Sequence, residues 1–121
     1  LQQAGFQITA TYRSEKPGLQ QLKDAGVVMM IGTDSGIPMK FHSQSTWNEL
    51  DVWVNEFGFD PMLTIKAATY WPAVSMRVDQ DYGTISEGKY ADIIAVRGDV
   101  LRYISLLQNV DMVIKHGKRV K

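Results

Sequence analysis

Apolar positions follow two different periods along the chain. Residues 27–31 form an unbroken apolar run, VVMMI, with no polar position between them. Such a run is typical of a strand that is covered on both faces, as in a parallel sheet. The preceding segment, PGLQQLKDAG, has Pro17 where a first helical turn accepts it and Gly26 where a helix ends. We therefore predict a short helix followed by a buried strand over Val27–Ile31.

A helical period follows the strand and a loop. Its apolar face is made of residues three and four positions apart: Trp47, Leu50, Val54 and Phe57. Thr46 and Glu49 have the spacing of a capping box, so we expect Glu49 to cap the helix start. Gly58 ends the helix. A second helix is predicted from Asp60 as N-cap and Pro61 at the first helical position.

The period changes near residues 79–83, and the last third is mainly β. A strand is predicted from Ala91 to Val96, and a β-hairpin around His116–Gly117. We therefore divide the chain into an α/β part, residues 1–80, and a β part, residues 81–121.

Composition excludes several classes of protein. The 121 residues suit one domain, and 45% hydrophobic residues suffice for a core. Thirteen basic residues balance thirteen acidic ones, so no field attracts nucleic acid or an anionic membrane. No apolar stretch approaches the roughly 20 residues that span a bilayer, and the first sixteen residues lack the apolar centre of a signal peptide. The absence of cysteine fits a reducing compartment, so we expect a cytoplasmic protein.

Asp34 is the main candidate for chemistry. It follows the apolar run directly, between Gly32 and Gly36, and ligands of parallel sheets bind beyond the carboxyl ends of the strands. The alternative is an Asx-turn in which the carboxylate binds local amides. His42, in the same loop, is a second candidate, whereas His116 is expected to be exposed at a hairpin tip. These residues alone do not make a zinc signature.

Residues 83–89 imitate a phosphate-binding loop. They fit G-x-x-x-x-G-K, but Tyr90 stands where a Ser or Thr would hold magnesium. A strand also follows where a helix should open. We therefore interpret Gly83 and Gly88 as two turns that bracket a short strand.

Five segments together resemble a known family: GVVMMIGTDSG, HSQSTWNEL, AATYWPA, GTISEGKYADIIAV and VDMVIKHGKRV. They occur in the order found at the C-terminal end of metal-dependent amidohydrolases, and are most similar to the imidazolonepropionase-like and prolidase-like branch. The resemblance extends over the chain from residue 17. Its most specific part is G-x-I-x-x-G-K-x-A-D at residues 83–92. Trp71–Pro72–Ala73 departs mildly from the family's usual Asn-Pro-Ala.

The resemblance implies a (β/α)₈ barrel with a small β-sandwich. Residues 1–80 would be the C-terminal part of the barrel, with Val27–Ile31 as its last strand, and residues 81–121 a segment of the sandwich. Asp34 would bind the catalytic divalent metal, expected to be zinc, accept a proton from the attacking water and help to deliver it to the leaving amine. His42 would lie near the substrate. The chemistry is coherent because such a metal lowers the pKa of water from about 15.7 to near 7.

Most metal ligands that the resemblance implies are missing from the sequence. The family has a His-x-His pair on its first strand, often a modified lysine on the fourth, and histidines on the fifth and sixth. This sequence has no His-x-His, and His42 is the one histidine before residue 100. A complete barrel needs about 250 residues. We therefore expect a fragment of a hydrolase of amide bonds, of a dipeptide or another small amide, that is inactive and holds no metal stably by itself.

A non-enzymatic alternative stays open at this point. The chain could be a self-associating α/β interaction module. A lone barrel strand exposes backbone edges and an apolar face, and four aromatic residues would lose neighbours: Trp47, Trp53, Phe57 and Phe59. Both hypotheses predict a homo-oligomer, with elements exchanged between copies.

Overall fold

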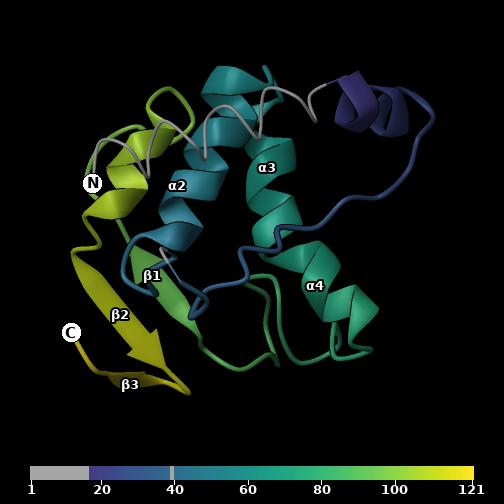
Figure 1. Ribbon diagram of the computed structural model, residues 1–121. Coiled ribbons are helices and arrows are strands. Elements are labelled where there is room, and N and C mark those ends of the chain that lie inside the picture. Colours follow the sequence, from purple (N-terminus) through teal and green to yellow (C-terminus); the bar gives the residue numbers. More distant parts are fainter. Residues whose placement is uncertain (1–16, 39) are drawn as a thin grey trace.

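Helices occupy the first half of the described chain, and a small sheet lies near its C-terminal end (Figure 1). The computed structural model describes residues 17–38 and 40–121. Residues 1–16, to which the signal-peptide prediction applies, lie outside the described part. The elements in chain order are a helical segment over residues 17–24, α2 (Ser45–Asp51), a π-helical turn (Val52–Glu56), α3 (Pro61–Ala68), α4 (Tyr70–Ser75), β1 (Ile93–Ala95), a 3₁₀ helix (Ile104–Gln108), β2 (Met112–Lys115) and β3 (Lys118–Arg119).

The first helix ends at Gly26, as the sequence predicts. Gly26 has a φ of 78°, in the left-handed region that glycine adopts at low cost. Its amide donates to the carbonyl of Lys23 at 3.0 Å, and the next amide, of Val27, donates to the carbonyl of Leu22 at 3.0 Å. These two bonds form a Schellman motif, which satisfies carbonyls that a helix end leaves without partners. Local sequence alone therefore determines where this helix stops.

The predicted buried strand Val27–Ile31 is wrong for this chain. The segment has no regular secondary structure and crosses the helices as an extended connection (Figure 1). Val28 is 55% exposed, and Val27 and Met30 are exposed as well. A strand needs a neighbouring strand to pair its amides and carbonyls, and within residues 17–38 and 40–121 no strand pairs with this segment. The apolar run therefore lacks the pairing that its sequence pattern indicates.

Helix α2 begins without the predicted capping box. Its N-cap is Gln44, and no side chain caps the helix start. The turn before it leads directly into the helix, because the hydroxyl of Ser45 donates to the carbonyl of Phe41 at 2.7 Å. Thr46 is therefore already inside the helix and has no N-cap geometry. Glu49 has a different partner, described below.

An aromatic cluster at the end of this helix forms the core. The amide of Phe57 donates to the carbonyl of Val52 at 3.0 Å, five residues back, which is the bond of a π-helical turn. Val52 and Trp53, in this turn, are buried, whereas the helical period of the sequence predicts that Val54 is buried. The Phe59 ring meets those of Trp53 and Phe57 edge-on, at centroid distances of 5.4 Å and 5.7 Å.

Three of the four aromatic residues expected to lose neighbours are therefore buried within this chain. Trp53, Phe57 and Phe59 are at most 5% exposed, and Ala67 of α3 packs into the same cluster. They keep their neighbours because α2, the π-helical turn and α3 supply them. The sequence-based expectation attributed those neighbours to missing barrel elements.

Helix α3 begins as predicted. The side chain of Asp60 accepts a hydrogen bond from the amide of Leu63 at 2.9 Å, and Pro61 occupies the first turn. Thr64 is fully buried, and its hydroxyl donates to the Asp60 carbonyl at 3.0 Å, so the buried polar group is satisfied. Within the described residues, every helix falls short of the length and apolar character that crossing a bilayer requires.

The sheet has three antiparallel strands in the order β1-β2-β3. Ile93 pairs with Ile114 and Ala95 with Met112. The hairpin is confirmed, since His116 and Gly117 join β2 to β3 with φ values of 48° and 77°. The residues that imitate a phosphate loop lie in turns and bends before β1, with no helix after them. The turns are confirmed, whereas the short strand expected between Gly83 and Gly88 is wrong, because residues 84–87 have no strand structure.

The connection between α4 and the sheet is tightly bonded. A Cβ on Gly83 would lie 2.8 Å from the Cβ of Ala73, so only glycine fits there without displacing α4. The ammonium group of Lys89 donates to the carbonyl of Asp79 at 2.5 Å. The amide of Tyr90 donates to the carbonyl of Asp81 at 3.0 Å.

Asp92 ties the start of β1 to the hairpin turn. Its carboxylate accepts from Lys115 Nζ at 2.8 Å and from the amide of His116 at 2.8 Å. The hydrogen bond from Lys115 is the larger cause, and that from His116 the next, of a pKa for Asp92 below its ordinary value of 3.8. A carboxyl group whose pKa is lowered on folding stabilises the fold above its unfolded-state pKa, and this contribution is lost as the pH falls through the folded-state pKa.

We predict that Asp92→Asn destabilises the chain at neutral pH and that the deficit shrinks as the pH falls below 3.8, where the parent carboxyl also becomes protonated. Urea unfolding midpoints from neutral to acid pH measure the deficit. Lys115→Gln is the companion variant. It should show the same pH dependence, because it removes the cation of the same ion pair. A deficit that is constant with pH would contradict the role of the carboxylate charge.

Candidate functional site

The candidate site is the loop that follows the apolar segment, from Gly32 to His42. Asp34 lies near its start with a φ of 51°, a left-handed conformation that aspartate adopts more readily than most residues. The hydroxyls of Thr33 and Ser35, on either side of it, are 2.7 Å apart. The Asp34 side chain is exposed, and no residue within 17–38 and 40–121 bonds to its carboxylate.

The amides that could form an Asx-turn with Asp34 have other partners. The amide of Ser35 donates to Thr33 Oγ1 at 3.2 Å, and that of Gly36 to the carbonyl of Lys40 at 2.9 Å. The amide of Ile37 reaches the backbone carbonyl of Asp34 and not its carboxylate. The Asp34 carboxylate is therefore available for a ligand.

His42 belongs to the same closed loop. The hydrogen bonds from Gly36 to Lys40 and from Lys40 to Ile37 close the loop on itself. The His42 ring lies against Gly36, where a Cβ would be 3.0 Å from Cε1 and 3.3 Å from Nε2. Gly36 has a φ of 100°, so its lack of a side chain permits both the turn and the close approach of the ring. The two candidate residues thus share one loop.

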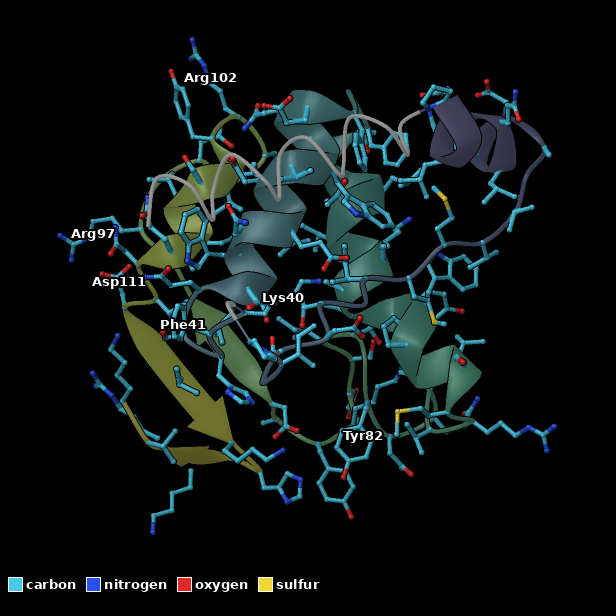
Figure 2. The ribbon with its side chains drawn as sticks, viewed as in Figure 1. Lys40, Phe41, Tyr82, Arg97, Arg102 and Asp111 are labelled. Carbon is cyan, nitrogen blue, oxygen red and sulfur yellow. The ribbon has the colours of Figure 1, made fainter. Side chains whose placement is uncertain are left out.

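His116 lies in a separate cluster. Its ring stacks on Tyr90 with a centroid distance of 4.8 Å, and Tyr90 stacks on Tyr82 at 5.1 Å. Tyr82, Tyr90 and Asp92 also line a cavity of about 410 Å³ beside β1. Figure 2 shows Tyr82 well away from Lys40 and Phe41 of the Asp34 loop. The expected exposure of His116 is confirmed, since its side chain is 51% exposed.

Glu49 has a role that the sequence did not predict. It is only 6% exposed, and its Oε1 accepts a hydrogen bond from the amide of Gly32 at 3.1 Å. Burial raises its pKa above the ordinary value. The Gly32 amide and the positive charge of Lys40 oppose the rise, and the negative charge of Asp34 adds to it. The sequence holds a signal of this burial, because Glu49 precedes Leu50 and lies one helical turn before Trp53, and both of these residues are apolar.

The segment before Asp34 has a second attachment. The amide of Ile31 donates to the carbonyl of Ala67 at 3.0 Å. Ala67 lies in the last turn of α3, where helix carbonyls have no partner within the helix. Two consecutive amides, of Ile31 and Gly32, are therefore attached to two different helices just before the candidate residue.

The site offers a single ligand position for a metal. Across residues 17–38 and 40–121, no three His, Cys, Asp or Glu side chains are grouped so that they could hold an ion. An exposed carboxylate is an oxygen ligand of the type that divalent metals bind. The exposed carboxylate of Asp34 is of this ligand type, and the described residues supply no cluster around it.

Comparison with known proteins finds a matching family and several similar proteins. Residues 10–120 match the amidohydrolase family. The fold is similar to a Xaa-Pro dipeptidase with bound methionine in its active site, with a TM-score of 0.77 and 37% identity over 97% of this chain. It is also similar to a putative prolidase from Bifidobacterium longum, with a TM-score of 0.73 and 32% identity over 83% of this chain. Among curated proteins, an adenine deaminase of Rubrobacter xylanophilus is 34% identical over 64 residues, 52% of this chain.

All three relatives are much longer than this chain. It spans 26% of the dipeptidase, 24% of the putative prolidase and 11% of the deaminase. The family match covers nearly every residue and agrees with the motifs found in the sequence. The chain belongs to the amidohydrolase family.

Proposed function

We propose that this chain contributes one metal ligand, Asp34, to a metal-dependent hydrolase of amide bonds whose other ligands lie outside these 121 residues. The observation that carries the proposal is the exposed Asp34 carboxylate, in a loop whose amides are bonded elsewhere. The names of the dipeptidase and the putative prolidase support a dipeptide or a similar small N-acyl amino acid as the substrate. The fold around the site would be the end of a (β/α)₈ barrel.

The chemistry assigned to this chain is proton transfer. A bound divalent metal, for which we propose zinc, supplies a nucleophile at neutral pH by lowering the pKa of water. Asp34 accepts the proton of the attacking water and returns it to the leaving amine, because a carboxylate beside the reacting atoms can act as base and then as acid. Its exposed position leaves both carboxylate oxygens accessible for this role.

His42 is proposed to bind the substrate. Its imidazole can donate or accept a hydrogen bond, and it lies in the same closed loop as Asp34, against Gly36. A substrate held between the two residues would present its amide to the carboxylate and a polar group to the imidazole. The loop thus combines a catalytic and a binding residue.

We predict that the chain alone shows no hydrolase activity and binds no stoichiometric metal, because one carboxylate does not hold a catalytic ion. Activity towards Xaa-Pro dipeptides should require complementation with a polypeptide that comprises the remainder of the dipeptidase fold. In that complex, Asp34→Asn should lower kcat by at least about a hundredfold.

Asp24→Asn is the matched control, because Asp24 is an exposed aspartate whose described partner is Gln20 of its own helix. It should leave kcat unchanged. Metal analysis and steady-state kinetics provide the readouts. Stoichiometric metal in the chain alone, or full activity of Asp34→Asn, would refute the role assigned to Asp34.

The position of His42 can be tested through Gly36. A Cβ at Gly36 would press on the imidazole, and the backbone has a positive φ, so Gly36→Ala should lower the free energy of unfolding by about 1 kcal/mol and shift the His42 ring resonances. Gly58→Ala is the control, since Gly58 has a φ of 73° but open space around it. It should destabilise similarly without moving the His42 signals. Unchanged His42 resonances in Gly36→Ala would contradict the packing of the ring.

A second candidate function is self-association as a non-enzymatic α/β module. It is favoured by exposed apolar side chains along the predicted strand and the loop: Val27, Val28, Met30, Ile37 and Phe41. Exposed apolar side chains that gather in one patch are covered in most soluble proteins. We propose that a second copy of the chain covers it, with elements exchanged between the copies.

We predict oligomers of the chain at micromolar concentration, measured by light scattering. Val28→Lys should shift the population towards monomer, because it places a charge in the apolar surface. Ile85→Lys is the control, since Ile85 is 82% exposed and lies beside β1. A monodisperse monomer of the unchanged chain would exclude this function.

A further inference from the structure

A buried carboxylate beside the candidate site has no place in the chemistry above. Glu49 is 6% exposed, on the face of α2 that also buries Leu50. Burying a carboxylate is unfavourable unless hydrogen bonds replace its water. The hydrogen bond that the structure gives it comes from the amide of Gly32, seventeen residues earlier in the chain. The bond thus connects the helix to the loop of Asp34.

The location of this bond gives it influence over Asp34. Gly32 precedes Asp34 by two residues, and the neighbouring amide of Ile31 is bonded to the Ala67 carbonyl of α3. One attachment alone would let the segment rotate about it. Two consecutive attachments, to α2 and to α3, fix both the position and the direction in which the chain leaves the helices.

The loop beyond Gly32 is held together by its own hydrogen bonds. The bond between Gly36 and Lys40 and that between Lys40 and Ile37 close it on itself. The hydroxyls of Thr33 and Ser35 fix the residues on each side of Asp34. The loop joins the helical part at two places: at Gly32, through Glu49, and at Phe41, whose carbonyl accepts hydrogen bonds at the start of α2. The attachment at Gly32 is the nearer one to Asp34 along the chain.

We propose that Glu49 is a positioning residue that holds the Asp34 carboxylate in place by accepting the hydrogen bond of the Gly32 amide. This role rests on the proposed function of Asp34. Glu49 touches neither substrate nor metal in this proposal, and acts through the backbone of Gly32.

The first test needs no activity and uses the chain as it is. Amide hydrogen exchange, followed by NMR, should show Gly32 protected in the unchanged chain. Glu49→Ala should speed exchange at Gly32 by about tenfold or more, as loss of a bond to a charged acceptor predicts. Glu49→Gln should keep most of the protection, because its Oε1 still accepts. Asp51→Ala is the control, since it removes a carboxylate of the same helix that bonds to Asn55, and it should leave Gly32 unchanged.

The second test uses the complemented enzyme. Glu49→Ala should lower kcat about tenfold to a hundredfold, with KM changed less than about threefold, because a displaced catalytic group slows the reaction more than binding. Glu49→Gln should rescue kcat. A structural role alone would lower the amount of folded enzyme without changing kcat per folded molecule.

The outcomes separate the two proposals. An unprotected Gly32 amide in the unchanged chain, or unaltered exchange in Glu49→Ala, would refute the attachment whatever the activity. Faster exchange with unaltered kcat would refute positioning and leave a structural bond. If Asp34→Asn is fully active, the proposed function fails, and exchange at Gly32 still reports on the attachment by itself. If Glu49→Ala does not fold, exchange in the unchanged chain and in Glu49→Gln decides.

Discussion

The packing of Phe59 against Trp53 and Phe57 is the contact on which the rest of the helical part depends. The Phe59 amide also donates to the carbonyl of Trp53 at 3.0 Å, and α3 starts two residues later. The end of the π-helical turn and the start of α3 are therefore held in one arrangement. This arrangement sets the distance between the two acceptors, on Glu49 and Ala67, that receive the segment before Asp34. The candidate site is thus positioned by the core even though its carboxylate is exposed.

Features that depend on neighbouring residues could be predicted from the sequence. The helix end at Gly26, the cap at Asp60 and the turn at His116–Gly117 are each fixed within a few positions, and each is confirmed. The strand predicted at Val27–Ile31 is wrong. The pattern reports only that the segment is apolar on both faces, whereas a strand also needs partner strands for its backbone hydrogen bonds. The buried position of Val52 was not predicted, since a π-helical turn changes the helical period without a clear sequence signal.

The candidate site was predicted in part. The sequence and the resemblance to the amidohydrolases placed Asp34 and His42 in one loop, and the structure brings the His42 ring against Gly36 of that loop. Their chemical roles are proposals. Glu49 was assigned to capping because its spacing from Thr46 is that of a local motif, and its true partner, Gly32, is remote in sequence. A carboxylate next to a buried leucine and one turn before a buried tryptophan is a better signal of such a long-range bond than of a cap.

The bonded connection after α4 has a mechanical consequence. Gly83 packs against Ala73 with no room for a side chain, and Lys89 fastens the carbonyl of Asp79 across the turn. A connection that is packed and bonded in this way resists bending, so α4 and the start of the sheet should move together. Bending between α4 and the sheet would have to break the hydrogen bond from Lys89 to the Asp79 carbonyl. This lysine therefore has a structural role in a segment whose sequence resembles a nucleotide-binding loop.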